Sequence, residues 1–234
     1  PLSWAGPARY TPPGLDYDDL SQIDIAVISH NHYDHLDAPT IKELNRRQPE
    51  QPPHYFVPMG NKDWFADRGI DDVTELDWWQ SAEHDGIRLT AAPVQHFSGR
   101  GLTDKNETLW CGWILNARAS QLFFAGDTGY SRDFADIHNR AGPMDLSLIP
   151  IGAYEPRWFM QAMHVNPEEA VQIHQDLKSR FSVGMHWGTF RLTDEPHNEP
   201  PARLTSALKA ARIPGEQFFV MQHGETRMLD DILR

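Results

Sequence analysis

Residues 29–37, Ser29-His30-Asn31-His32-Tyr33-Asp34-His35-Leu36-Asp37, place four metal-ligand side chains within six positions. The stretch follows an apolar run over 23–29 that predicts a buried strand, and it precedes a predicted helix over 38–47. In an extended loop, His30 and His32 point to the same side, while Asp34 and His35 begin the next turn and reach a second point. One loop between a strand and a helix can therefore supply ligands to two metal ions.

Short β-branched, apolar runs alternate with helical patterns along the rest of the chain, which predicts an α/β protein built in layers. Further strands are predicted over 55–59, 73–76, 87–94, 109–115, 121–125, 146–151, 181–185 and 217–221, and further helices over 63–67, 132–139, 167–177 and 203–211. Asp37 is a candidate N-cap, and Asn166 with Glu169 forms a capping box. Since no repeat or long linker interrupts the pattern, we expect a single domain spanning 1–234.

Composition excludes several classes of protein. The chain has 234 residues, is 40% hydrophobic and has 21 Lys plus Arg against 33 Asp plus Glu, a net charge of −12. The apolar content argues against disorder, and no run approaches the roughly 18 apolar residues of a spanning helix. A net negative charge without a Lys/Arg cluster argues against a nucleic-acid partner. The single cysteine, Cys111, excludes an intramolecular disulfide.

Three more ligand-type side chains stand at the ends of predicted strands. His96, Asp127 and His186 each follow an apolar run and have a glycine or turn residue close by. Imidazole and carboxylate ligands without thiolate suit zinc in a hydrolytic site, with iron or manganese as substitutes. These residues are the candidates to complete a metal site that the 29–37 loop begins.

The order H-x-H-x-D-H, a separate His, an Asp and a last His resembles the metallo-β-lactamase superfamily, whose fold is an αββα sandwich with a dinuclear zinc site. Six blocks resemble the N-acyl-phosphatidylethanolamine-hydrolysing phospholipase D family: 29–37, 75–79 (ELDWW), 124–130 (FAGDTGY), 149–160 (IPIGAYEPRWFM), 164–171 (HVNPEEAV) and 186–190 (HWGTF). The segment 95–113, with Arg100, Asp104, Asn106 and Trp110, is similar to bacterial members. Because the chain opens at Pro1, the first N-terminal strands of this fold are expected to be missing.

The resemblance implies roles for particular residues. It implies that His30, His32 and His96 hold one zinc, that Asp34, His35 and His186 hold a second, and that Asp127 bridges the two. Asp34, Asp127 and His164 are the candidate catalytic residues, and Tyr33, Trp158 and His223 are candidate substrate contacts. Asp24 is a candidate to orient a ligand imidazole, with an ordinary strand-entry aspartate as the equal alternative. For Tyr33, His164 and His223 a purely structural role is as well supported, and for Trp158 the alternative is core packing.

The implied reaction is hydrolysis of N-acyl-phosphatidylethanolamine to an N-acylethanolamine and phosphatidic acid by a hydroxide that bridges two zinc ions. A phospholipid substrate, a homodimer and a cytoplasmic or peripheral membrane location follow from the same resemblance. The segment 154–160 is one candidate lipid contact, and Leu2, Trp4 and Tyr10 form another. The alternatives are a hydrolase of a soluble phosphodiester, cyclic phosphate or lactone, a redox di-iron protein, and a noncatalytic membrane-binding module.

Overall fold

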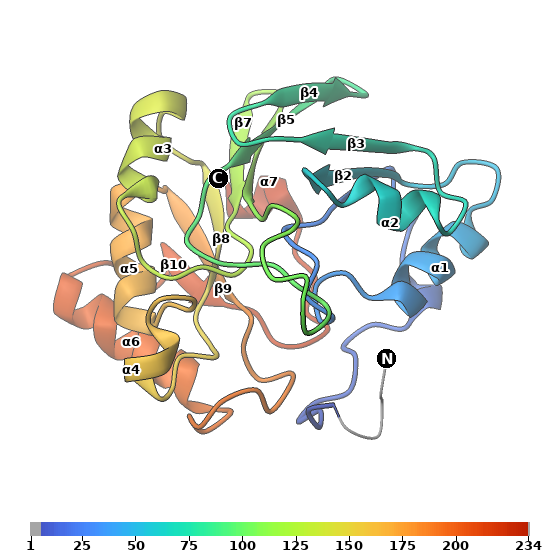
Figure 1. Cartoon of the computed structure of the whole chain (residues 1–234). Coiled ribbons are helices and arrows are strands. Elements are labelled where there is room, and N and C mark those ends of the chain that lie inside the picture. The colour runs from blue at the N-terminus through green and yellow to red at the C-terminus, as the bar shows by residue number, and fades with distance from the viewer. Residues whose placement is uncertain (1–5, 234) are drawn as a thin grey trace.

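The computed structural model describes residues 6–233 and folds them around two sheets that pack face to face (Figure 1). The smaller sheet is parallel, in the order β1 (Ile25–Val27), β2 (His54–Pro58) and β3 (Val73–Leu76). The larger sheet has the order β10-β9-β8-β7-β6-β5-β4. Its strands are β4 (Ser81–His84), β5 (Ile87–Ala92), β6 (Gly112–Ala117), β7 (Ser120–Phe124), β8 (Leu146–Pro150), β9 (Phe181–Met185) and β10 (Phe218–Val220).

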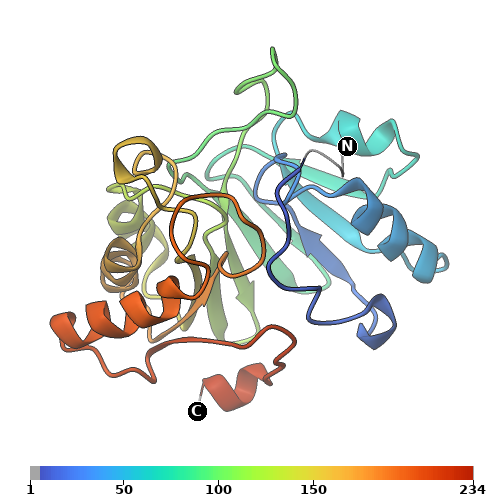
Figure 2. The ribbon, with the colours of Figure 1, turned by 90° about the horizontal axis from the view of Figure 1, so that it is seen from below.

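Helices cover the outer face of each sheet (Figure 2). The helices are η1 (Tyr17–Asp19), α1 (Ala38–Arg47), α2 (Lys62–Ala66), α3 (Asp133–Ala141), α4 (Arg157–Met160), α5 (Pro167–Asp176), α6 (Glu199–Ala211) and α7 (Leu229–Ile232). Of these, α1 and α2 flank the small sheet, and α3, α5 and α6 flank the large one. The layer order is αββα, which confirms the predicted fold.

Three buried apolar clusters correspond to the three interfaces between these four layers. On β2, the side chains of Tyr55 and Val57 join Ile41 of α1 and Phe65 of α2, whereas Phe56 joins the cluster between the sheets. This alternation follows from the two-residue period of a strand. A strand buried on both faces needs apolar residues at successive positions, and β2 has them.

The large sheet divides its side chains in the same way. Trp113 of β6 enters the cluster between the sheets, and its neighbour Ile114 packs with Phe134 of α3 and Ile173 of α5. Trp113 is fully buried, and its indole Nε1 donates to the carbonyl of Ile28 at 2.9 Å. That bond ties the large sheet to the segment just ahead of the 29–37 loop.

Strand direction brings the predicted ligands to one edge. β5 is antiparallel to β6 and β6 to β7, while β7, β8 and β9 are mutually parallel, so β5, β7, β8 and β9 point the same way. Their carboxyl ends meet at one edge, and the loops there carry His96, Asp127 and His186. The loop after β1 joins this edge because the Cys111 N–H donates to the Ser29 carbonyl at 2.8 Å.

The predicted elements are present with boundary shifts of up to four residues, whereas the strand β4 and the short helices η1, α4 and α7 were not predicted. β3, β9 and α1 have the predicted bounds, whereas the first strand is only Ile25–Val27. β4 was not predicted because its sequence, Ser-Ala-Glu-His, is polar, as suits the edge strand of a sheet. Leu2 and Trp4 lie outside the described residues. Within 6–233, no helix has the length and apolar character needed to span a membrane.

Candidate metal centre

The loop after β1 is shaped by its own backbone. The N–H groups of His35 and Leu36 both donate to the His32 carbonyl, at 3.1 and 2.8 Å, which closes a tight turn. Asp37 then caps α1, because its Oδ2 accepts from the Thr40 N–H at 3.0 Å. The turn and the cap hold His32 and His35 above the strand end.

Two glycines allow the other loops to approach. Gly126 has φ +62°, and a Cβ there would lie 2.5 Å from the Cβ of Ser29. A Cβ at Gly152 would lie 2.3 Å from the His186 carbonyl oxygen. Because only glycine fits both positions, Asp127 can lie against the 29–37 loop, and the loop after β8 can lie against the one after β9.

The structure brings together all seven side chains that the sequence analysis named as metal ligands. One group contains His30, His32 and His96, and a second contains Asp34, His35, Asp127 and His186. Within each group, ligand atoms lie within 4.8 Å of one another. His164 joins His96 and Asp127 in a third such group, which overlaps the first two.

Asp127 stands between the first two groups. Its Oδ1 is 3.3 Å from His186 Nε2, and its Oδ2 is 3.0 Å from His35 Nε2. The same Oδ2 lies 3.9 Å from His30 Nε2 and 4.0 Å from His96 Nε2. The side chain of Asp127 is 3% exposed, so its charge is balanced by these imidazoles rather than by solvent. One carboxylate therefore contacts residues of both groups.

The Nδ1 atoms of two histidines are anchored, which turns their Nε2 atoms toward the centre. His96 Nδ1 donates to the Met163 carbonyl at 2.9 Å, and His30 Nδ1 hydrogen-bonds the Ser29 hydroxyl at 2.9 Å. His30 Nε2 is buried without a hydrogen-bond partner, and His35 Nε2 and Asp127 Oδ1 have only the ion-pair contacts described above. Buried polar atoms of this kind need a partner, and a cation suits converging imidazole and carboxylate lone pairs. The donor set therefore fits a metal.

The protonation states also suit a metal. Burial lowers the pKa of His30 well below its ordinary value and lowers that of His96 to about 3. Burial likewise lowers the pKa of His164 to about 4, although Asp127 opposes the shift. All three imidazoles are therefore neutral near pH 7, as His30 and His96 must be to bind metal.

The remaining groups form a charged cluster. Burial lowers the pKa of His35, but Asp127 and Asp34 outweigh it and raise that pKa to about 10. Asp127 and His186 are both held in their charged forms. Burial opposes the ionisation of each, but the attraction between opposite charges lowers the pKa of Asp127 and raises the pKa of His186. Two carboxylates thus hold extra protons on imidazoles, and a cation bound here would displace those protons.

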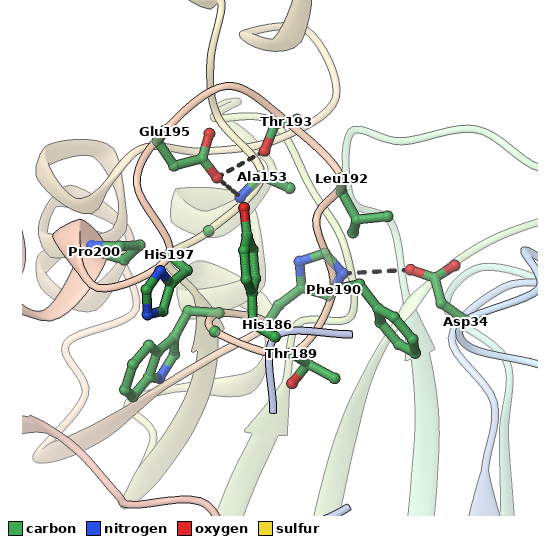
Figure 3. Close-up of a pocket in the computed structure, with 14 residues that line it drawn as sticks. Asp34, Ala153, His186, Thr189, Phe190, Leu192, Thr193, Glu195, His197 and Pro200 are labelled. Carbon is green, nitrogen blue, oxygen red and sulfur yellow. Dashed lines mark hydrogen bonds and ion pairs between the residues drawn. The ribbon is translucent and has the colours of Figure 1, made fainter. Parts of the chain in front are cut away.

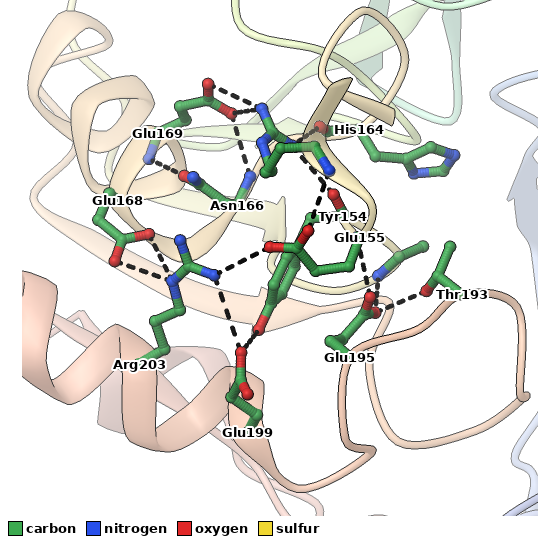
Figure 4. Close-up of polar contacts among 12 residues, drawn as sticks. Tyr154, Glu155, His164, Asn166, Glu168, Glu169, Thr193, Glu195, Glu199 and Arg203 are labelled. Atoms are coloured by element: carbon green, nitrogen blue, oxygen red, sulfur yellow. Dashed lines mark hydrogen bonds and ion pairs between the residues drawn. The ribbon is translucent and has the colours of Figure 1, made fainter. Parts of the chain in front are cut away.

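The His164 segment is held by a polar network that the sequence analysis did not identify (Figure 4). Arg157 Nη1 donates to the His164 carbonyl at 2.8 Å, and Nη2 donates to both carboxylate oxygens of Glu169 at 2.9 and 2.8 Å. Glu169 also closes the predicted capping box with Asn166 at the start of α5. The only sequence signal was that capping box, which gives no hint of the arginine.

A pocket opens beside Asp34 and His186 (Figure 3). Its far wall is organised by Glu195, which sequence reasoning also missed. The Glu195 carboxylate accepts from the Ala153 N–H at 2.7 Å and from the Glu155 N–H at 3.0 Å. It thereby joins the loop after β8 to the loop after β9. The Thr193 hydroxyl also donates to Glu195, at 2.7 Å. No local pattern marks the two backbone contacts, because both N–H groups lie some 40 residues away in the sequence.

Asp24 requires a correction. It precedes β1, at the opposite end of that strand from His30, and its exposed carboxylate accepts from Gln22 Nε2 at 2.9 Å. A strand rises about 3.3 Å per residue, so Asp24 is too far away to orient a ligand imidazole. The Ser29 hydroxyl and the Met163 carbonyl make those contacts instead.

The three candidate substrate contacts have different surroundings. Tyr33 packs against Arg100 and is not among the residues that line the pocket beside Asp34. His223 contacts the pocket residue Trp187 with ring centroids 5.2 Å apart and the rings tilted by 58°, and it too lies outside the pocket lining. Trp158 is 79% exposed, which excludes the core-packing alternative.

Residues 2–187 match the beta-lactamase superfamily domain, and the chain therefore belongs to the beta-lactamase superfamily. It is 42% identical over 95% of its length to N-acyl-phosphatidylethanolamine-hydrolyzing phospholipase D 1 of Caenorhabditis elegans. It is 38% identical over 85% of its length to the mitochondrial N-acyl-phosphatidylethanolamine-hydrolyzing phospholipase D of Saccharomyces cerevisiae. These identities confirm the resemblance found in the sequence.

The chain spans 65% of the length of the nematode relative and 43% of the yeast one. Among solved structures, a possible metal-dependent hydrolase from Veillonella parvula has the same fold, with a TM-score of 0.69 and 20% identity over 92% of this chain and 80% of that one. The fold and the grouped histidines and aspartates are together the features of a metal-dependent hydrolase of this superfamily.

Proposed function

We propose that this chain is a dinuclear zinc phosphodiesterase that hydrolyses N-acyl-phosphatidylethanolamine to an N-acylethanolamine and phosphatidic acid, acting as one domain over 1–234. The observation that carries the proposal is the convergence of seven ligand-type side chains in a chain 42% identical to a phospholipase D named for this substrate. In this proposal, His30, His32 and His96 would hold one zinc, Asp34, His35 and His186 would hold a second, and Asp127 would be shared between the two. Zinc ions bound in such a pair supply a water of lowered pKa and neutralise charge on phosphate oxygens.

The protein's own groups set the geometry of the reaction. Asp127 contributes negative charge between the two ligand groups, since its two oxygens face different histidines. His164 has its ring centroid 5.2 Å from that of His96 and 5.6 Å from that of His186, and its buried Nδ1 has no partner. Because its imidazole is neutral near pH 7, we assign it a hydrogen bond to the phosphodiester rather than a positive charge. Water adds to phosphorus, the bond to the ethanolamide oxygen breaks, and that oxygen takes up a proton.

Lipid access is assigned to the exposed turn of α4. Trp158 and Phe159 are 79% and 57% exposed, with ring centroids 5.7 Å apart. α4 leads directly into the segment that carries His164, so these rings lie close in sequence to the proposed substrate contact. Aromatic side chains of this kind favour a lipid–water interface. A peripheral contact with the lipid surface is therefore part of the proposal, and a homodimer stays a prediction.

Two assays on one metal-analysed preparation test the proposal. The first measures release of N-acylethanolamine from N-acyl-phosphatidylethanolamine in mixed micelles, and the second measures hydrolysis of bis(p-nitrophenyl) phosphate. We expect fast turnover of the lipid. Hydrolysis of the small diester without release from the lipid would contradict the lipid substrate and move the activity to a soluble phosphodiester. If both activities persisted after the metal was removed, the zinc mechanism would be contradicted.

A further inference from the structure

The loop between β5 and β6 carries Arg100, Asp104 and Asn106, residues that the proposed reaction does not use. These residues make hydrogen bonds within the loop and to the 29–37 segment. Asp104 Oδ2 accepts from the Arg100 N–H at 2.8 Å, and its Oδ1 accepts from the Gly101 N–H at 2.7 Å. The Gly99 N–H donates to Asn31 Oδ1 at 2.8 Å, so the loop is fastened to the 29–37 segment. Arg100 is thereby held over that segment.

The guanidinium of Arg100 joins the two ends of the ligand turn. Its Nη1 donates to the Asn31 carbonyl at 2.6 Å and to the Leu36 carbonyl at 2.8 Å. These two carbonyls enclose 32–35, which contains three of the seven proposed ligands. Charged hydrogen bonds to carbonyls are stronger than neutral ones, so this nitrogen restrains the separation of the two ends of the turn.

Tyr33 completes the attachment. The Arg100 guanidinium carbon lies 4.0 Å from the centroid of the Tyr33 ring, and the Tyr33 hydroxyl donates to the Arg100 carbonyl at 2.8 Å. Both the side chain and the backbone of Arg100 therefore contact 31–36. This arrangement also gives the exposed Tyr33 a role, since the pocket beside Asp34 does not use it.

We infer that Arg100 is a positioning residue that holds the turn of 32–35 in the shape required to bind metal, with Tyr33 as its stacking partner. The inference rests on the proposed function, because it assumes that His32, Asp34 and His35 are ligands. Without the guanidinium, the turn would have to be ordered when metal binds, and that ordering would reduce affinity. Loss of partners that orient ligands typically lowers metal affinity about 10–100-fold.

The test is zinc affinity of the whole chain, measured by competition with a chromophoric chelator. We expect Arg100→Met to weaken zinc binding by about 10-fold or more, and Arg100→Lys to weaken it less, because a lysine donates to the carbonyls but lacks the planar stacking group. The matched control is Arg68→Met. Arg68 lies over the Trp64 ring, at 3.8 Å, and donates to the Trp64 carbonyl. Arg100 lies farther from that ring, at 5.6 Å, and the hydrogen bonds to the Asn31 and Leu36 carbonyls come from Arg100.

The outcomes separate the inference from the function on which it rests. The inference would be overturned if Arg100→Met bound zinc as tightly as the wild type. It would also be overturned if Arg68→Met lost as much zinc affinity as Arg100→Met. Either result would leave the proposed metal centre intact. Wild-type protein that binds no zinc would overturn both. The visible spectrum of cobalt-substituted protein gives a second readout: Arg100→Met should alter the ligand-field bands, and Arg68→Met should not. If Arg100→Met fails to fold, Arg100→Lys gives the same comparison.

Discussion

Gly126 and Ser29 are in contact at the point where the loops after β7 and β1 meet, and a side chain at Gly126 would strike Ser29 at 2.5 Å. Asp127 follows the first residue and His30 follows the second. The contact therefore sets the spacing between a carboxylate and an imidazole, whose Oδ2 and Nε2 are 3.9 Å apart. The metal centre can therefore assemble only if the backbones of the loops after β7 and β1 come this close.

Gly126→Ala is expected to damage both stability and metal binding. Its positive φ costs on the order of 1–2 kcal/mol for a residue with a Cβ, and the contact with Ser29 adds to that. Gly86→Ala is the matched control, because Gly86 has φ +74° but no atom within 4 Å of its Cβ position. Chelator competition should give zinc binding weakened about 10-fold or more in Gly126→Ala alone. Equal affinity in both variants would contradict the role of this contact.

Asp127→Asn should abolish most activity while leaving folded protein. The amide keeps the shape of the side chain but removes the charge shared by the two ligand groups, and a loss of several kcal/mol corresponds to about 100-fold or more in turnover. Activity and zinc content per chain, measured on the same preparation, check this. Wild-type turnover in Asp127→Asn would contradict the assigned role of the carboxylate.

Trp158→Ala should weaken hydrolysis of micellar lipid more than hydrolysis of a small soluble diester. Removing a large apolar side chain from a lipid interface forfeits about 1.5–3 kcal/mol, or roughly 10-fold or more in apparent affinity for micelles. Met228→Ala is the control, since Met228 is 69% exposed just ahead of α7. The lipid KM should rise only in Trp158→Ala. Equal losses on both substrates would contradict a lipid contact.

His174 makes the folded state sensitive to acid. It is buried in the last turn of α5, its Nδ1 hydrogen-bonds the Ser182 hydroxyl at 2.8 Å, and burial lowers its pKa to about 4. Because the unfolded chain then binds more protons, this stabilisation is complete above about pH 6.5 and declines as the pH falls toward 4. Relative to His174→Gln, the wild type should lose about 2 kcal/mol of unfolding free energy between pH 8 and pH 5.

Urea unfolding of both proteins at the two pH values checks the His174 prediction. The control is His138→Gln, which replaces a histidine in the last turn of α3. A stability difference between wild type and His174→Gln that does not change with pH would contradict it.

Much of the fold was predictable because the decisive segments carry local signals. Asp37 and the pattern of 38–47 specify α1, and an apolar run specifies β9. The strand predicted over 109–115 begins only at Gly112, since Leu109 and Cys111 donate their N–H groups to Met59 and Ser29 in the other part of the fold. Tertiary pairing of that kind has no periodic signature.

In the metal centre, too, the residues with local sequence signals were predicted and those that depend on tertiary contacts were not. The H-x-H-x-D-H spacing and the strand-end positions of His96, Asp127 and His186 predicted which side chains would converge. For Asp24 the sequence left two roles equally open, and the strand-entry role is correct because the strand separates Asp24 from the ligands. The capping role of Glu169 was predicted, but its ion pair with Arg157 was not, because no periodic pattern relates the two side chains. Glu195 was missed because it accepts from backbone groups of a distant loop.

The measurement that tests the central claim most directly is a zinc titration of metal-free protein, followed by release of N-acylethanolamine from micellar N-acyl-phosphatidylethanolamine. The account predicts no release without zinc and a rise to a plateau at two zinc ions per chain. Undiminished release from the metal-free protein, or a plateau at one zinc ion per chain, would contradict it.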